Sequence, residues 1–393
     1  MSGASMKAGA EDLPATDTPE SARLPGMLRA LQGRHPSRPP VWFMRQAGRS
    51  LPEYRALRAQ SAASMLETCL DPDLAIEATL QPVHRHGVDA AVLFSDIMVP
   101  LLLAGVEVDI VAGTGPVLAH PVCSALDVER IIEGGTDLTT HPGGLDSVVA
   151  TVRGCVSRLG TPGTPPRDET PHPDRDPAGW TPLIGFGGAP FTLAAYMVAG
   201  RPSRDQLEAR TMMHADPRSW ERLMNWCAEV TGAFMAAQVE AGASVAQLFD
   251  SWAGSLPLTD YHRHVAPHSR LAIDLAHAAV SPTTGQTVPV IHFGTGTGEL
   301  VGAMHEAGGD AIGVDETIPL DVASARLGGD VPLQGNIDPS YLGAPTPVLD
   351  AHVAEVLERG RSAPGHVVNL GHGVPPHTDP EVLTHIVRVV HAA

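Results

Sequence analysis

The chain has 393 residues and a formal net charge of -18 at pH 7, and 43% of its residues are hydrophobic while 4% are aromatic. This apolar content suffices for a large core, whereas an acidic balance with few aromatic rings argues against nucleic-acid binding. No apolar run reaches the roughly 18 residues that a membrane span requires. The four cysteines show no CxxC spacing, which argues against a disulfide framework or a structural zinc site and fits a reducing cytoplasm.

Two segments are predicted to lie outside the folded core. Residues 1–25 are small and polar and lack the apolar centre of a signal peptide, so we expect a disordered tail. Residues 160–180 contain six prolines mixed with charged residues, which predicts a surface insertion. The rest of residues 26–393 is predicted to form one domain.

Short apolar runs alternate with helical patterns along this domain. The helical patterns that are clearest cover 74–86, 220–241, 300–307 and 348–359. The predicted strands are 41–44, 91–94, 183–186, 245–249, 290–293, 311–314, 331–334 and 367–370. Eight strands alternating with helices predict an α/β fold, a single (β/α)₈ TIM barrel. A doubly wound open sheet is the alternative, but no GxGxxG turn follows the first strand.

Nearly every predicted strand ends in polar or glycine-rich residues. Examples are SD after 91–94, DS after 245–249 and GHG after 367–370. In a parallel barrel the carboxyl ends of all strands share one rim, where active sites lie. Residues far apart in the sequence are therefore expected to meet at the C-terminal rim.

Four arginines follow the first predicted strand within 14 residues: Arg45, Arg49, Arg55 and Arg58. The guanidinium group is a rigid fork of donors that matches a carboxylate through two hydrogen bonds. Gly48 lets a ligand approach the backbone closely. The cluster predicts a site for an anion with several carboxylates, and the alternative is that these arginines pair with acidic side chains on a solvated surface.

Asp96 and Tyr196 follow two other strands. Asp96 is either a helix N-cap or a carboxylate that faces the arginines and accepts hydrogen bonds from N–H groups of a ligand. The segment GFGGAPFTL at 185–193 predicts a tight turn from strand to helix, and it lacks the Lys-Ser/Thr pair of a phosphate-binding P-loop. We expect the hydroxyl of Tyr196, on the helix that follows, to reach the rim.

Ser251 and His372 are further candidates at strand ends. No GxSxG elbow surrounds Ser251, so we interpret it as a hydrogen-bond donor and not as a nucleophile. His372 lies between two glycines, and a loop or core histidine is the alternative. The group His262, His264 and His268 is expected on a solvated helix. No histidine belongs to an HExxH or paired-cysteine metal motif.

Two long segments resemble signature motifs of the uroporphyrinogen decarboxylase family: PVWFMRQAGR at 40–49 and GFGGAPFTLAAY at 185–196. Shorter motifs follow in the order of that family: FSDI at 94–97, QLFDS at 247–251, QGNID at 334–338 and NLGHG at 369–373. The resemblance covers about residues 25 to 393. One departure is Ser50, where many members of the family carry an aromatic residue.

The resemblance implies a cytoplasmic, cofactor-free decarboxylase, usually a homodimer, that binds no metal. Its substrate would be uroporphyrinogen III, whose four acetate side chains become methyl groups to give coproporphyrinogen III. The catalytic residues implied by this resemblance are Arg45, Arg49, Asp96 and Tyr196. The substrate contacts implied are those four residues together with Gln46, Arg58, Phe249, Ser251 and His372.

Two other functions remain as alternatives. The related corrinoid-dependent methyltransferases hold zinc with a His-x-Cys pair and a late cysteine, but the comparable segments here are HFG at 292–294 and GHG at 371–373. Without these cysteines the thiolate ligands are missing. A non-catalytic tetrapyrrole carrier would be favoured by loss of the charged residues at the rim, and all of them are present.

Overall fold

The computed structural model describes residues 24–167 and 176–393. Residues 1–23 of the predicted tail and 168–175 of the predicted insertion lie outside the described residues. The C-terminal end of the insertion is tied to the domain, because the Trp180 side chain is 1% exposed and the Asp176 carboxylate accepts a hydrogen bond from the Gly26 N–H at 2.8 Å. No helix among the described residues has both the length and the apolar character to cross a membrane.

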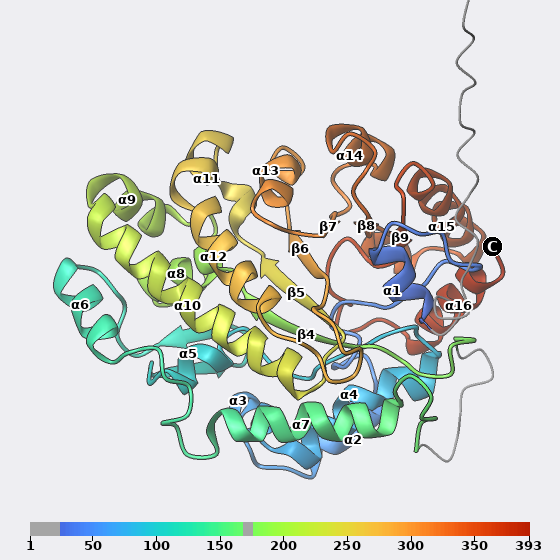
Figure 1. Ribbon diagram of the computed structural model, residues 1–393, viewed down its shortest axis with the longest axis horizontal. Helices are drawn as coiled ribbons and strands as arrows, with labels where there is room; N and C mark the ends of the chain where they lie inside the picture. The colour runs from blue at the N-terminus through green and yellow to red at the C-terminus, as the bar shows by residue number, and fades with distance from the viewer. Residues whose placement is uncertain (1–23, 168–175) are drawn as a thin grey trace, which may run out of the picture.

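The centre of the molecule is a parallel sheet in the order β1-β4-β5-β6-β7-β8-β9, with helices placed around its outside (Figure 1). Its strands are β1 (Ala91–Val92), β4 (Leu183–Gly188), β5 (Val245–Asp250), β6 (Val290–Gly294), β7 (Ala311–Gly313), β8 (Leu333–Gln334) and β9 (His366–Val367). Each strand is hydrogen-bonded in parallel register to the next. Seven of the eight predicted strands are therefore present, and the α/β-barrel architecture is confirmed.

The eighth predicted strand, 41–44, is reduced to a single bridge. Val41 pairs in parallel with Val368 just beyond β9, and its carbonyl accepts a hydrogen bond from the Asp89 N–H just before β1 at 2.8 Å. The segment thus lies between the first and last strands of the sheet and completes the ring. Its regular pairing ends early because the chain turns at Arg45, where φ is 61°, in the left-handed region.

The Gln46 side chain takes the place of a backbone partner at this seam. Its Oε1 accepts a hydrogen bond from the Phe43 N–H at 3.0 Å, and its Nε2 donates to the Ala90 carbonyl at 3.0 Å. The side chain is completely buried. This geometry gives Gln46 a structural role, and its contact with a ligand stays a prediction.

The helices surround the sheet, and the four that the sequence predicted are confirmed to within three residues at each end. They are α1 (Gly26–Leu31), α2 (Pro52–Ala59), α3 (Met65–Cys69), α4 (Pro72–His86), α5 (Val99–Leu103), α6 (Ala125–Glu133), α7 (Gly144–Leu159), α8 (Pro190–Ala199), α9 (Leu207–Ala215), α10 (Pro217–Ala241), α11 (Leu258–His264), α12 (Ala266–His277), α13 (Val301–Glu306), α14 (Leu320–Arg326), α15 (Thr346–Gly360) and α16 (Pro380–His391), with the 3₁₀ turns η2 (Ala253–Ser255) and η3 (Pro339–Gly343). A hairpin of β2 (Val108–Val111) and β3 (Gly115–Leu118) was not predicted.

Three of the longer helices start at an Asp-Pro pair. Asp71, Asp216 and Asp379 each accept a backbone hydrogen bond from the first turn of α4, α10 and α16, at 3.1, 3.2 and 3.0 Å. The carboxylate satisfies an N–H that has no partner within the helix, and the proline that follows is already in the helical φ range. These helix starts are therefore set by local sequence.

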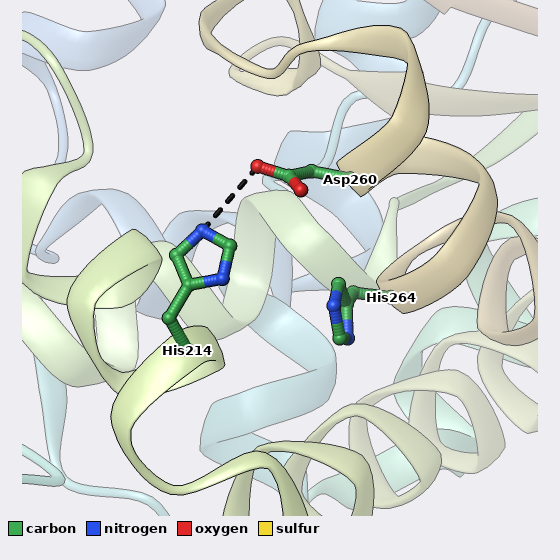
Figure 2. A group of neighbouring side chains, drawn as sticks. All are labelled: His214, Asp260 and His264. Atoms are coloured by element: carbon green, nitrogen blue, oxygen red, sulfur yellow. Dashed lines mark ion pairs between the residues drawn. The ribbon is translucent and has the colours of Figure 1, made fainter.

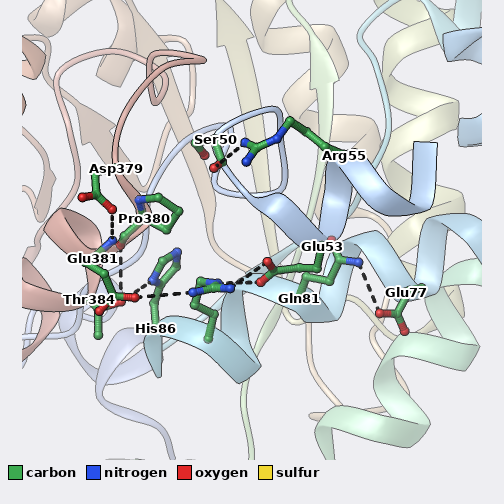
Figure 3. Close-up of polar contacts among 11 residues, drawn as sticks. Ser50, Glu53, Arg55, Glu77, Gln81, His86, Asp379, Pro380, Glu381 and Thr384 are labelled. Atoms are coloured by element: carbon green, nitrogen blue, oxygen red, sulfur yellow. Dashed lines mark hydrogen bonds and ion pairs between the residues drawn. The ribbon is translucent and has the colours of Figure 1, made fainter. Parts of the chain in front are cut away.

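Arg85 near the end of α4 links helix α2 to the C-terminal helix α16. Its guanidinium binds both carboxylate oxygens of Glu53 on α2, at 2.6 and 2.8 Å, and reaches Glu381 on α16 at 3.4 Å. Beside it the His86 ring is hydrogen-bonded to the Thr384 hydroxyl of α16 at 2.8 Å (Figure 3). The helix that follows the arginine-rich segment is thereby anchored to the C-terminal helix.

We expect Gln46→Ala to lower the free energy of unfolding by roughly 2–5 kcal/mol, because it leaves the Phe43 N–H and the Ala90 carbonyl buried without partners. Urea unfolding followed by circular dichroism measures this change. Gln60→Ala, at an exposed glutamine after α2, is the control and is expected to change stability by about 0.5 kcal/mol or less. Equal unfolding curves for the two variants would contradict the role of Gln46 in closing the barrel.

Candidate active site

Arg45 and Asp96 follow two different strands, Tyr196 lies on α8 after a third, and the three are close enough for their charges to act on one another. The half-buried Asp96 carboxylate accepts a hydrogen bond from the Met98 N–H at 2.9 Å. Burial raises its pKa, while the Met98 hydrogen bond and the positive charge of Arg45 act in the opposite direction. Burial also raises the pKa of Tyr196, on which the charges of Asp96 and Arg45 act with opposite signs. The three side chains thus lie within electrostatic reach of one another.

Arg45 occupies a position that depends on the last strand-end motif. Its side chain packs over Gly373, where an added Cβ would lie 2.6 Å from the Arg45 Cδ. It lines an open pocket of about 420 Å³ together with His372, Glu316 and Asp338. The first and last strand-end motifs, predicted to share the rim, therefore meet in one pocket.

The four clustered arginines divide into two pairs. Arg55 donates to the carbonyls of Arg49 and Ser50 at 2.6 and 3.0 Å, and Figure 3 shows the contact with Ser50. Arg58 donates to the Ala63 carbonyl at 2.9 Å and to the Thr68 hydroxyl. These two arginines hold their own segment together.

Arg45 and Arg49 are exposed and differently placed. Within residues 24–167 and 176–393 their guanidinium groups form no hydrogen bond or ion pair. Both groups are therefore available to an anionic ligand, as the anion-binding interpretation requires. The guanidinium groups of the exposed Arg34 and Arg153 also have no such partner in the described part of the chain, so this availability is not unique to Arg45 and Arg49.

Ser251 lies in a second rim pocket of about 470 Å³, not in the pocket of Arg45. The Ser251 carbonyl accepts a hydrogen bond from the Thr295 hydroxyl at 2.8 Å, which joins the loops after β5 and β6. Arg204 and Arg210 also line this pocket, and the sequence did not indicate them. Arg204 precedes α9 and Arg210 lies within it, so neither follows a strand, and the strand-end pattern gave no signal for them.

Aromatic side chains line the barrel mouth next to these pockets. The Phe249 ring packs edge-on against Phe186 and Phe293, with ring centroids 5.3 and 6.0 Å apart. The Tyr196 ring meets Trp252 in the same edge-on manner at 5.7 Å. The predicted contacts of Phe249, Ser251 and His372 with a ligand stay predictions.

Two acidic groups at the rim were also missed. Burial raises the pKa of Glu316, the neighbouring Asp315 adds to the rise, and His372 opposes it. Below Ser251, the completely buried Asp250 carboxylate accepts a hydrogen bond from the Thr192 hydroxyl at 3.1 Å and lies 3.6 Å from the His292 ring. The sequence indicated a polar DS pair at the end of β5, but it did not indicate that the Asp250 side chain is buried.

The cysteines do not form a metal centre among the described residues. Cys69, Cys155 and Cys227 are buried, which raises the pKa of each thiol, to about 12 for Cys155. Cys123 is exposed. The group of potential metal ligands that the described residues bring together contains histidine and aspartate only. This arrangement argues against the zinc-thiolate site of the methyltransferase alternative.

The fold is an α/β barrel whose C-terminal rim carries the exposed Arg45 near Asp96 and Tyr196. The family model described as uroporphyrinogen decarboxylase (URO-D) matches residues 24–393. The chain belongs to the uroporphyrinogen decarboxylase family.

Individual relatives agree with the family model. The chain is 55% identical to a uroporphyrinogen decarboxylase of Arthrobacter sp. over 367 residues, 93% of this chain and 96% of the relative. It is likewise 55% identical to one of Leifsonia xyli subsp. xyli over 375 residues, 93% of each chain. A solved methyltransferase from Methanosarcina mazei superposes with a TM-score of 0.68 at 17% identity, over 93% of this chain and 96% of that one, which supports the fold alone.

Proposed function

We propose that this chain catalyses the decarboxylation of uroporphyrinogen III in tetrapyrrole biosynthesis. Four acetate side chains become methyl groups, and coproporphyrinogen III and four molecules of CO₂ are the products. Family membership supports the reaction class. The observation that carries the site assignment is the convergence of Arg45, Asp96 and Tyr196 at the rim.

The arginines suit the charge of this substrate. Uroporphyrinogen carries eight carboxylates, each of which can accept two parallel hydrogen bonds from a guanidinium group. Arg45 and Arg49 are exposed, and neither has an ion-pair partner among the described residues. Binding the substrate would therefore break no ion pair of theirs that the structure describes.

Decarboxylation of an acetate needs an acceptor for the electron pair of the breaking C–C bond. Protonation of the adjacent pyrrole carbon makes a cationic ring that accepts this pair as CO₂ leaves. A proton then adds to the remaining methylene carbon, and the ring proton is lost, which leaves a methyl group and a neutral ring. The substrate thus supplies its own electron sink, and the reaction as proposed uses no cofactor.

Asp96 is suited to stabilise the cationic ring. A carboxylate fixed in a partly buried position can accept hydrogen bonds from the pyrrole N–H groups. Its attraction to the ring becomes stronger as positive charge develops on the ring. Its Met98 hydrogen bond holds one carboxylate oxygen in place before the substrate arrives. The cost of reorganising the site in the transition state is thereby lowered.

Tyr196 and Arg49 complete the proposed catalytic group. Because burial raises the pKa of Tyr196, its hydroxyl keeps the proton and can donate a hydrogen bond to an acetate. In this proposal Arg49 or Arg45 is the residue nearest the reacting acetate. Arg58 is proposed to act through Thr68 and Ala63, which it binds, by holding the arginine-rich segment in shape.

We expect Asp96→Ala to lower kcat by about 10²–10³-fold, the usual loss when one preorganised electrostatic group is removed. The measurement is anaerobic turnover of freshly reduced uroporphyrinogen III after treatment with a chelator, with products separated by their number of carboxylates. Asp109→Ala, at an exposed aspartate of β2, is the matched control and is expected to retain full turnover. Intact substrate after incubation with folded wild-type protein would refute the proposed reaction.

We expect activity to fall on the acid side at a higher pH than an ordinary aspartate would produce. The carboxylate form of Asp96 is the active one, and burial raises its pKa, so protonation begins at a higher pH. The positive charge of Arg45 lowers that pKa. Arg45→Ala should therefore move the pKa of Asp96 upward, and Arg45→Lys should leave it nearly unchanged.

Carbon NMR titration of the aspartate carboxyl groups measures this pKa in the free protein. Asp96→Asn identifies the signal, and the acid limb of kcat/KM provides a second reading. The substrate carboxylates are the same in every variant, so a difference between variants reports on the protein. An Asp96 pKa that is the same with alanine and lysine at position 45 would contradict the proposed coupling.

We also propose that the active form is a homodimer that works in the cytoplasm, as is usual in the resembled family. Light scattering coupled to size exclusion should give a mass near twice the 41.2 kDa of one chain. A mass near 41.2 kDa at the protein concentration of a turnover assay would refute the dimer.

A further inference from the structure

Three potential metal ligands lie together on the outer helices. His214 is at the end of α9, and Asp260 and His264 are on α11 (Figure 2). Asp260 and His264 are four residues apart, so they share one face of their helix. One ligand atom from each of the three residues lies within 4.8 Å of the others.

The distances are close to those of a bound transition-metal ion. Zinc binds imidazole nitrogens and carboxylate oxygens at about 2.0–2.2 Å, so two ligand atoms of a tetrahedral site are about 3.4 Å apart. The His214 Nε2 and the Asp260 Oδ2 are already 3.3 Å apart. A nitrogen of His264 lies within 4.8 Å of both atoms, which leaves the fourth position of a tetrahedral site to water.

A simple ion pair explains only part of this cluster. His214 and Asp260 form one, but their side chains are 56% and 22% exposed, and such a pair contributes little to stability. An ion pair also gives no reason for the His264 ring, whose centroid lies 6.0 Å from that of His214. Imidazole ligands suit zinc, copper, iron and nickel, whereas magnesium and calcium prefer oxygen ligands alone.

Both helices of the cluster are close in sequence to residues that line the Ser251 pocket. Arg204 and Arg210 of the lining precede and belong to α9, which ends at Ala215. Ser251 and Gly254 of the lining lead through η2 toward α11. An ion held between α9 and α11 would therefore tie together two segments that continue from this pocket.

We propose that His214, Asp260 and His264 bind one divalent transition-metal ion, with zinc as the best match, which ties α9 to α11. The ion is a structural tie at the side of the rim. It takes no part in the decarboxylation chemistry, and its binding does not depend on the function proposed above.

Isothermal titration of the untagged full-length protein with zinc chloride tests the site. We expect one zinc ion per chain. The dissociation constant should rise by roughly tenfold or more in His264→Ala and in Asp260→Asn, because mutation of residues that merely support metal ligands already lowers metal affinity by about that factor. His262→Ala is the matched control, because His262 is an exposed histidine of the same helix outside the cluster. It is expected to bind zinc like the wild type.

Hydrogen exchange of the same samples tests the tie. Zinc is expected to slow the exchange of backbone amides in 207–215 and 258–264 in the wild type and in His262→Ala, and not in His264→Ala. Circular dichroism confirms that each variant is folded. No binding at one equivalent, or binding that is equal in all variants, would mean an adventitious ion only and would overturn the proposal.

Discussion

The seam where the first strand segment meets β1 and β9 is the constraint on which the rest of the site depends. The segment is joined to its neighbours by backbone hydrogen bonds to Asp89, Val368 and Val374 and by the buried amide of Gln46. The chain then turns sharply and presents Arg45 at the rim. If this seam opened, the position of Arg45 relative to Asp96 would be lost, because Arg45 directly follows the segment.

The rim combines opposite charges without pairing them. The protein has a net charge of -18, yet Arg45 and Arg49 have no ion pair in the described part of the chain, and Asp96 is held by a backbone N–H. Burial raises the pKa of Asp96, and the positive charge of Arg45 lowers it. Unpaired charges of this kind do not stabilise the fold. They remain available to a ligand that carries both carboxylates and N–H groups.

The rim is also divided. Arg45 and His372 line one pocket, and Ser251 lines another with Arg204 and Arg210. Trp252 belongs to the lining of the Ser251 pocket, and its ring packs edge-on against that of Tyr196.

The sequence by itself determined the alternation of strands and helices, the Asp-Pro helix starts and the polar strand ends, because these depend on neighbours within a few residues. It also placed Arg45 and Asp96 on a common rim, since parallel strands bring their ends together. Tertiary structure decided which arginines stay unpaired, that Gln46 faces inward to close the barrel, and that Asp250 points into the core. It also brought Arg204 and His214 to the side of the rim, because those contacts join residues that no local pattern relates.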